Sequence, residues 1–79
     1  MSDGRLRWQC KRGMRELDEL LARYLGSAYE RAAETEKAAF RGLLELPNPE
    51  LIGYLLGRQV IEDPVLSDLV NKIRRLRFP

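Results

Sequence analysis

Residues 8–18 read Trp-Gln-Cys-Lys-Arg-Gly-Met-Arg-Glu-Leu-Asp and combine a helix break, a helix start and dense mixed charge. Gly13 marks the break, because glycine ends a helix without steric penalty where φ must be positive. Glu16 and Asp18 follow in the first turn of the next helix, where negative charge complements the helix dipole. The stretch therefore predicts a short helix that ends near Arg12 and a longer helix directly after the break.

Apolar residues recur at helical spacing in four segments, the first of which is the longer helix after Gly13, and this predicts an amphipathic helix in each. The residues expected to face inward are Leu17, Leu20, Leu21, Tyr24 and Leu25; Ala39, Phe40, Leu43 and Leu44; Leu51, Ile52, Leu55 and Leu56; and Val65, Leu66, Leu69, Val70 and Ile73. No segment shows the sustained alternation that is typical of β-strands.

Caps and prolines mark the helix boundaries. Thr35 is the expected cap of the third helix, and Pro47 and Pro49 cannot continue that helix. Asn48 is the expected cap of the fourth helix, with a proline at its first position, and Asp63 repeats this signal for the fifth. We expect the Gly-Ser pair at 26–27 to weaken the second helix without ending it.

The predicted fold is all-α, a compact five-helix bundle in a single domain spanning residues 1–79. We expect an ordered core over about residues 5–74 and a frayed basic tail behind it. The 79 residues, of which 44% are hydrophobic, support one small core.

Several classes of function are disfavoured by what the sequence lacks. It has no His and a single Cys, so zinc sites of the usual kinds and His-dependent catalysis are unavailable. It contains no phosphate-binding loop and no nucleophile elbow. The acidic pairs are expected to be ordinary solvated groups on helix surfaces: Glu16, Asp18 and Glu19, and Glu34 and Glu36. We therefore expect a protein that is not an enzyme and that holds no metal.

The same sequence indicates a compartment. Cys10 has no intramolecular disulfide partner, which favours a reducing environment. No apolar run resembles a signal peptide or a membrane helix. A cytoplasmic protein without membrane insertion is expected. The net charge of +2 indicates little about partners.

Three features each have two interpretations. Cys10 has cationic neighbours that could activate its thiol, but it shares a helical side with Leu6, which favours a core residue. Trp8 is expected to be partly buried, with packing favoured over recognition. The basic C-terminal segment is interpreted as a solvated terminus in preference to a nucleic-acid contact.

The segment from Arg12 to Glu16 has two interpretations, and the sequence favours neither. It could be a helix break in which Arg12 pairs with Glu16, an exposed pair worth well under about 1 kcal/mol. It could also be a partner surface, where Gly13 permits close approach of another backbone and Arg15 supplies a donor.

The segment from Arg5 to Asp18 resembles the signature of the succinate dehydrogenase FAD assembly (flavinylation) factors, the SdhE-like family. The similarity continues in Glu36-Lys37, Phe40, Leu43-Leu44-Glu45, Pro49-Glu50-Leu51 and Tyr54-Leu55. It covers most of residues 5–57. The Arg-Gly-x-x-Glu core alone would be a weak pattern, but Trp8 upstream and the later blocks make it specific.

The resemblance implies an assembly factor that binds the flavoprotein subunit of succinate dehydrogenase, and in bacteria also that of fumarate reductase. Such a factor promotes covalent attachment of FAD to a His of the client, so the client handles FAD and this chain binds no cofactor stably. It would be a monomer when free and would bind no nucleic acid. Carried over by position, the partner-binding residues are Arg5, Trp8, Arg12, Gly13, Met14, Arg15, Glu16 and Asp18.

A purely structural oligomerisation domain is one alternative function. The other is a small basic nucleic-acid-binding helical module that uses both Arg-rich ends. Such a module would bind DNA or RNA with an affinity that falls steeply with salt.

Overall fold

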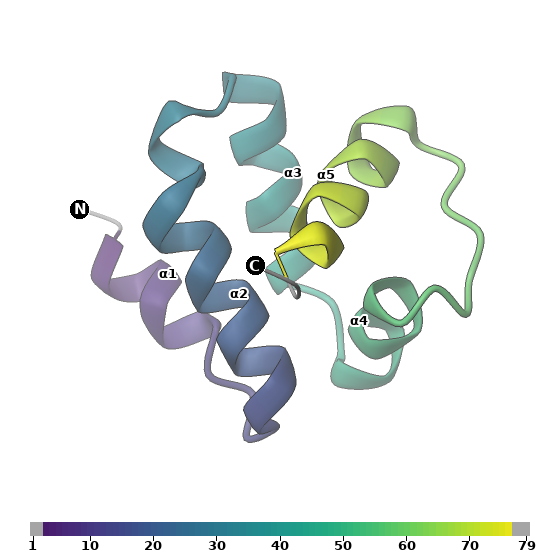
Figure 1. Ribbon diagram of the computed structural model, residues 1–79, viewed down its shortest axis with the longest axis horizontal. Coiled ribbons are helices and arrows are strands. Elements are labelled where there is room, and N and C mark those ends of the chain that lie inside the picture. The colour runs from purple at the N-terminus through teal and green to yellow at the C-terminus, as the bar shows by residue number, and fades with distance from the viewer. Residues whose placement is uncertain (1–2, 77–79) are drawn as a thin grey trace.

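The computed structural model describes residues 3–76, which form five α-helices and one turn of 3-10 helix. The elements are α1 (Asp3–Gln9), α2 (Arg15–Ser27), the 3-10 turn (Tyr29–Arg31), α3 (Glu34–Leu44), α4 (Asn48–Leu55) and α5 (Pro64–Arg75). α5 packs against α2, α3 and α4, while α1 packs against α2 at the opposite side of the molecule (Figure 1). The predicted all-α fold with five helices is confirmed.

The centre of the core is an aromatic cluster joined to leucines from every helix. Tyr24 lies beside Phe40 with ring centroids 4.7 Å apart, and Tyr29 closes the cluster at 5.5 Å from Phe40. Such tilted arrangements add to the apolar area that the rings bury. The remaining buried hydrophobic residues are Leu6, Cys10, Leu17, Leu20, Leu21, Leu25, Leu43, Leu44, Leu51, Leu55, Leu69, Val70 and Ile73.

Five residues that were expected to face inward are only partly covered, and Ala39 is one of them. Leu56 is 43% exposed and Val65 is 40% exposed, so their assignment to the core was wrong. Leu56 caps the end of α4 and Val65 lies in the first turn of α5, and a residue at a helix end has core on only one side. Ile52 and Leu66 are half-buried at the edge of the core.

Two predicted helix boundaries are corrected. α2 ends at Ser27, whose hydroxyl donates to the carbonyl of Arg23 at 2.5 Å, and the chain then enters the 3-10 turn. The Gly-Ser pair therefore does end this helix. α3 begins at Glu34 with Ala33 as its N-cap, so Thr35 lies inside the first turn and is not the cap. The local capping preference of Thr did not decide this boundary.

The two proline-marked starts differ in their outcome. Asp63 caps α5 as predicted, since its carboxylate accepts from the backbone N–H of Val65 at 3.0 Å. The N-cap of α4 is Pro47, and Asn48 is the first residue of the helix. The side chain of Asn48 accepts from Arg12 at 3.2 Å and is therefore not used as a cap.

A polar network links three helices beside the aromatic cluster. The hydroxyl of Tyr24 in α2 donates to Glu36 in α3 at 2.5 Å, and Lys72 of α5 lies 3.1 Å from the same carboxylate. Donation from Tyr24, helped by Lys72, lowers the pKa of Glu36. Glu36 is thus a structural group, and its assignment to the solvated surface was wrong.

The C-terminal helix α5 extends one residue beyond the predicted ordered core. α5 continues to Arg75, and Leu76 caps it and packs on the core, so the first two residues of the predicted tail are ordered. The remainder of the predicted tail, residues 77–79, lies outside the described residues. Within residues 3–76 there is no helix with the length and apolar character needed to cross a bilayer.

Candidate functional site

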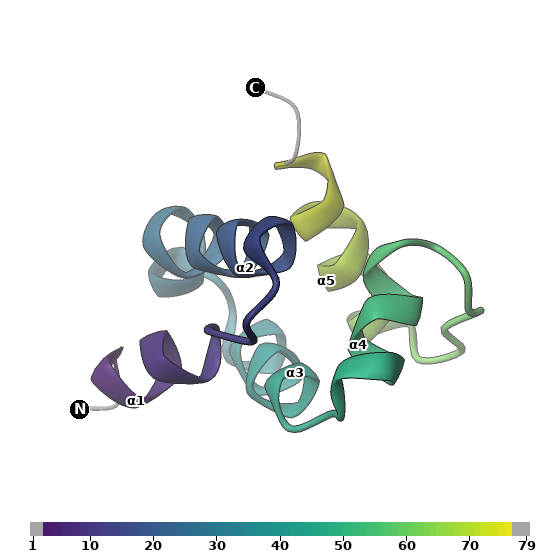
Figure 2. The ribbon, with the colours of Figure 1, turned by 90° about the horizontal axis from the view of Figure 1, so that it is seen from below.

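The connection between α1 and α2 has the break that the sequence predicted. α1 ends at Gln9, and the amide of Cys10 still donates to the carbonyl of Leu6 at 3.1 Å. Gly13 has a φ of +81°, in the left-handed region that favours glycine. Met14 then caps α2 from an extended backbone conformation. The loop thereby turns the chain from one helix directly into the next (Figure 2).

Asp18 holds this loop from inside the first turn of α2. Its carboxylate accepts from the backbone N–H of Arg12 at 2.7 Å and from that of Gly13 at 3.2 Å. Both oxygens therefore bind the loop backbone in charge-assisted hydrogen bonds, which are stronger than neutral ones. Asp18 is not the ordinary solvated group that was expected, because its role is to shape the loop.

The guanidinium of Arg12 turns inward and bonds to the end of α3. Its Nη1 atom donates to the carbonyl oxygen of Leu46 at 3.1 Å, and its Nη2 atom donates to the carbonyl oxygen of Leu44. Its Nε atom donates to the carbonyl of Gln9 at 3.0 Å. The last carbonyls of a helix lack helical partners, and a cation there is also favoured by the helix dipole.

This geometry answers the question that the sequence left open for Arg12. Its guanidinium binds carbonyl oxygens and Asn48 in the free chain, and it is not paired with Glu16. We call this set of bonds the Arg12 clamp. It fastens the loop between α1 and α2 to the end of α3.

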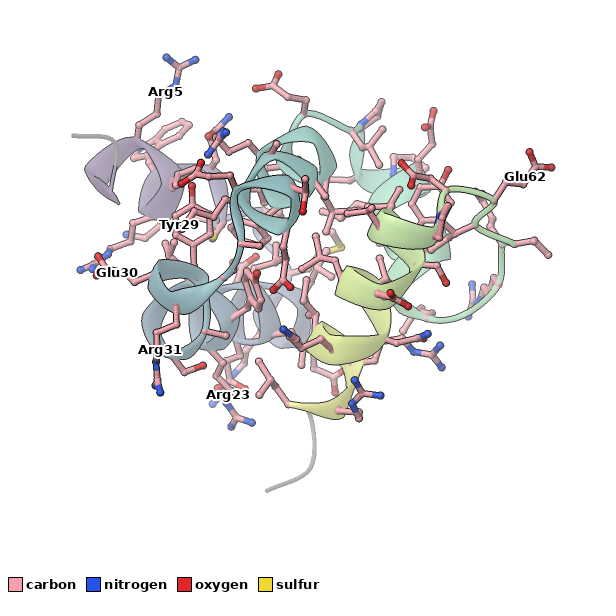
Figure 3. All side chains as sticks on the ribbon, turned by 90° about the horizontal axis from the view of Figure 1, so that it is seen from above. Arg5, Arg23, Tyr29, Glu30, Arg31 and Glu62 are labelled. Atoms are coloured by element: carbon pink, nitrogen blue, oxygen red, sulfur yellow. The ribbon has the colours of Figure 1, made fainter. Side chains whose placement is uncertain are left out.

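Trp8 points the other way. It is 74% exposed, so the expectation that packing would cover it was wrong. Leu6 and Cys10 occupy the one face of α1 that meets the core, with exposures of 3% and 2%, and a helix of seven residues offers no second buried face. Arg5 also projects away from the other elements (Figure 3).

Cys10 is a core residue, as favoured by its helical position. Burial raises the pKa of its thiol to about 11, which keeps the group protonated at neutral pH. A reactive thiol needs the opposite shift. The interpretation of Cys10 as a nucleophile is therefore disfavoured by its environment.

The outward-facing members of the predicted site are exposed or half-buried, and we call them together the docking surface. It comprises Arg5, Trp8, Gly13, Met14, Arg15 and Glu16. All are exposed except Met14, which is half-buried at the N-terminal end of α2. Arg12 and Asp18 lie behind this surface and hold the loop that presents it. The structure thus separates the eight predicted residues into an outward-facing group and an inner pair.

An apolar groove of about 360 Å³ begins where the docking surface ends. It lies between α2 and α4, and we call it the α2–α4 groove. Its walls include Met14, Leu17 and Leu20 from the side of α2, and Ile52, Leu55 and Leu56 from the side of α4. Glu16, Glu19 and Arg23 form its polar rim.

Sequence reasoning missed this groove because it placed Ile52 and Leu56 in the core. One signal was available. α4 has four large apolar residues within eight positions, which is more than one narrow face of so short a helix can bury.

Acidic side chains are numerous near this surface, but they do not converge. Within residues 3–76, no group of three or more His, Cys, Asp or Glu residues is arranged to hold a metal ion. The donors that the surface offers are guanidinium groups, an indole and backbone N–H groups, which suit recognition of another protein.

Comparison with known proteins identifies the family. The family model described as "Flavinator of succinate dehydrogenase" matches residues 4–77. The chain belongs to this family. The FAD assembly factor SdhE of Methylococcus capsulatus is 47% identical over 73 residues, covering 92% of this chain and 88% of the relative. That of Shewanella oneidensis is 38% identical over 79 residues, covering 100% and 96%.

In this member of the flavinator family, the Arg-Gly-x-x-Glu motif combines two kinds of residue. Arg12 is bonded internally, whereas Gly13 and Glu16 are exposed. The motif therefore acts partly as scaffold and partly as surface. Resemblance to the family alone had assigned all of its residues to the surface.

Proposed function

We propose that this chain is an assembly factor that binds the flavoprotein subunit of succinate dehydrogenase and promotes covalent attachment of FAD to it. The observation that carries the proposal is the 74% exposure of Trp8 next to the outward half of the motif. Trp and Arg are the residues that most often supply the binding energy of protein interfaces. Membership of the flavinator family supports the choice of client.

The loop is built to present a fixed shape to this client. Asp18 binds two consecutive amides of the loop, and the Arg12 clamp fastens the loop to α3. A surface that is ordered before binding loses less conformational entropy on association. Gly13 adds no side chain, and a Cβ at this position would meet no atom of the chain within 4 Å. A client backbone can therefore approach the loop closely.

The factor contributes geometry and not a reactive group. The chain has no His, and its one thiol is buried and kept protonated. In the proposed mechanism the docking surface holds the flavin domain of the client in the arrangement in which flavin and the attacking client residue meet, as expected for catalysis by positioning. The client holds FAD, the factor is not itself an enzyme, and it acts in the cytoplasm as a monomer. The flavoprotein subunit of fumarate reductase is a second proposed client.

The test uses cells that lack this chain and express the flavoprotein subunit with each variant. Covalently bound flavin is measured by its fluorescence in the denatured subunit. Gly13→Arg should abolish flavinylation and leave the helical circular dichroism nearly unchanged. Trp8→Ala, which introduces no backbone strain, should reduce flavinylation strongly.

The matched control is Gly42→Arg, at an exposed glycine of α3 where an added Cβ would also meet nothing within 4 Å. It should flavinylate as the unmodified chain does. Full flavinylation with Gly13→Arg would refute the proposed mechanism.

The nucleic-acid alternative is tested by titration with duplex and single-stranded DNA at two salt concentrations. It predicts tight binding that weakens steeply as salt is raised. Two features support the protein client instead: Arg12 and Arg23 donate to carbonyl oxygens of the chain itself, and Glu16 lies within the docking surface. A carboxylate at this position would repel phosphate.

A further inference from the structure

We infer that the α2–α4 groove is a second part of the client interface, which receives a large apolar side chain of the flavoprotein subunit flanked by Lys or Arg. The inference rests on the proposed function, because it names a chemistry for the same client. It extends the interface to α4, an element outside the motif.

The α2–α4 groove is continuous with the docking surface. Met14 and Glu16 belong to both the docking surface and the wall or rim of the groove. A client that covers the outward half of the motif therefore reaches the mouth of the groove without crossing intervening surface. The N-terminal end of α2 and the whole of α4 also lie at the same end of the molecule (Figure 1).

The groove has the size and the apolar lining of a site for a large side chain. Its volume of about 360 Å³ is at the lower end of the range for ligand sites and suits one or two large side chains. Leu56 is 43% exposed at its edge, so apolar area is left open to water in the free chain. A cavity whose apolar wall is open to solvent is typical of a site that takes an apolar side chain from a partner.

The charge on the rim of the groove indicates which residue flanks the apolar side chain of the client. Glu16 and Glu19 are exposed on the rim, whereas the ion pairs within residues 3–76 involve Glu34 and Glu36. The guanidinium of Arg23 is directed to the carbonyl of Leu76 at 2.8 Å. With two carboxylates and one guanidinium, the rim carries a net negative charge, whereas Arg5 of α1 and Arg15 at the start of α2 supply the cations of the docking surface. A client segment that matches this groove carries a cation beside its apolar residue.

The experiment measures binding of the purified chain to the purified apo-flavoprotein subunit of succinate dehydrogenase by isothermal titration calorimetry. Leu56→Glu should weaken binding about tenfold or more, because it places a carboxylate in an apolar site. Glu19→Lys should weaken binding about fivefold, and this loss should shrink as salt is raised. Circular dichroism and thermal unfolding confirm that each variant is folded.

Two control variants match these substitutions away from the groove. Val65→Glu alters an apolar residue of similar exposure, 40% against 43%, in the first turn of α5. Glu62→Lys reverses an exposed acid that points away from the bundle (Figure 3). Both should bind within about twofold of the unmodified chain.

The outcomes separate this inference from the proposed function. If Gly13→Arg abolishes binding and Leu56→Glu and Glu19→Lys bind normally, the groove is not part of the interface and the inference is overturned. If the unmodified chain itself does not bind the subunit, the proposed function fails as well. If sedimentation shows a dimer that Leu56→Glu dissociates, a second copy occupies the groove, and this too overturns the inference.

Discussion

The Nη1 atom of Arg12 lies 3.1 Å from the carbonyl oxygen of Leu46, which joins segments 34 residues apart. The same guanidinium bonds to the carbonyl of Leu44 and the side chain of Asn48. One side chain thereby satisfies the end of α3 and fixes the start of α4. Arg12, the first arginine of the motif, therefore links distant segments of the chain, whereas Arg15 is exposed.

Replacing Arg12 by lysine should destabilise the fold. Lysine keeps the positive charge but is a point donor on a flexible stem, so it cannot reach the acceptors that a planar guanidinium spans. We expect the free energy of unfolding to fall by about 1–2 kcal/mol in a urea titration followed by circular dichroism. Arg15→Lys is the control and should change it by less than about 0.5 kcal/mol. Equal losses in the two variants would contradict the clamp.

Glycine substitutions should separate backbone strain from docking. Gly13 and Gly57 both have positive φ, +81° and +74°, so alanine at either position should cost about 1 kcal/mol of folding stability. Only Gly13 lies on the docking surface. Gly13→Ala should therefore weaken binding to the flavoprotein subunit about fivefold or more, and Gly57→Ala should leave it unchanged. Equal weakening by both would show that stability, and not contact, governs binding.

The Tyr24–Glu36–Lys72 network should make stability depend on pH. Donation from Tyr24, helped by Lys72, lowers the pKa of Glu36 in the folded chain. A lowered folded pKa means that this contribution is complete above the unfolded value, about 4.3, and is lost as pH falls through the folded value. We expect Glu36→Gln to flatten the acid limb of a plot of unfolding free energy against pH.

The control for that measurement is Glu34→Gln, on the same helix, where the glutamate side chain is 86% exposed. It should leave the acid limb as it is in the unmodified chain. The alkaline limb tests Tyr24 separately. Burial raises the pKa of Tyr24, so its contribution should be lost as pH rises past the unfolded value of about 10, and Tyr24→Phe should remove this loss.

Cys10 should be unreactive until the chain unfolds. Burial raises the pKa of its thiol to about 11, and only the thiolate attacks disulfide reagents. We expect labelling by a chromogenic disulfide at pH 8 to follow the urea unfolding curve. Because the folded pKa is raised, Cys10 should contribute stability up to about pH 8.5, and this contribution should be lost as pH rises toward 11. Rapid labelling of the folded chain would contradict this burial.

Local signals predicted much of the fold and less of the site. The break at Gly13 and the cap at Asp63 were predicted correctly, since positive φ and N-capping depend on a few neighbouring residues. Cys10 was also placed correctly, because it shares a helical face with Leu6. Thr35 and Asn48 were assigned as caps by the same kind of signal, but Ala33 caps α3 and Pro47 caps α4.

The sequence by itself determined that this chain forms short amphipathic helices separated at Gly13 and at its prolines, because those features follow from backbone sterics and periodicity. Only the tertiary structure decided that Arg12 turns inward and Trp8 outward. The carbonyl acceptors of Arg12 at the end of α3 are more than 30 residues away along the chain, and α1 has only one face that meets the core. The packing of elements that are distant in the sequence decides which side of a helix end is buried. The same packing leaves the α2–α4 groove open to solvent.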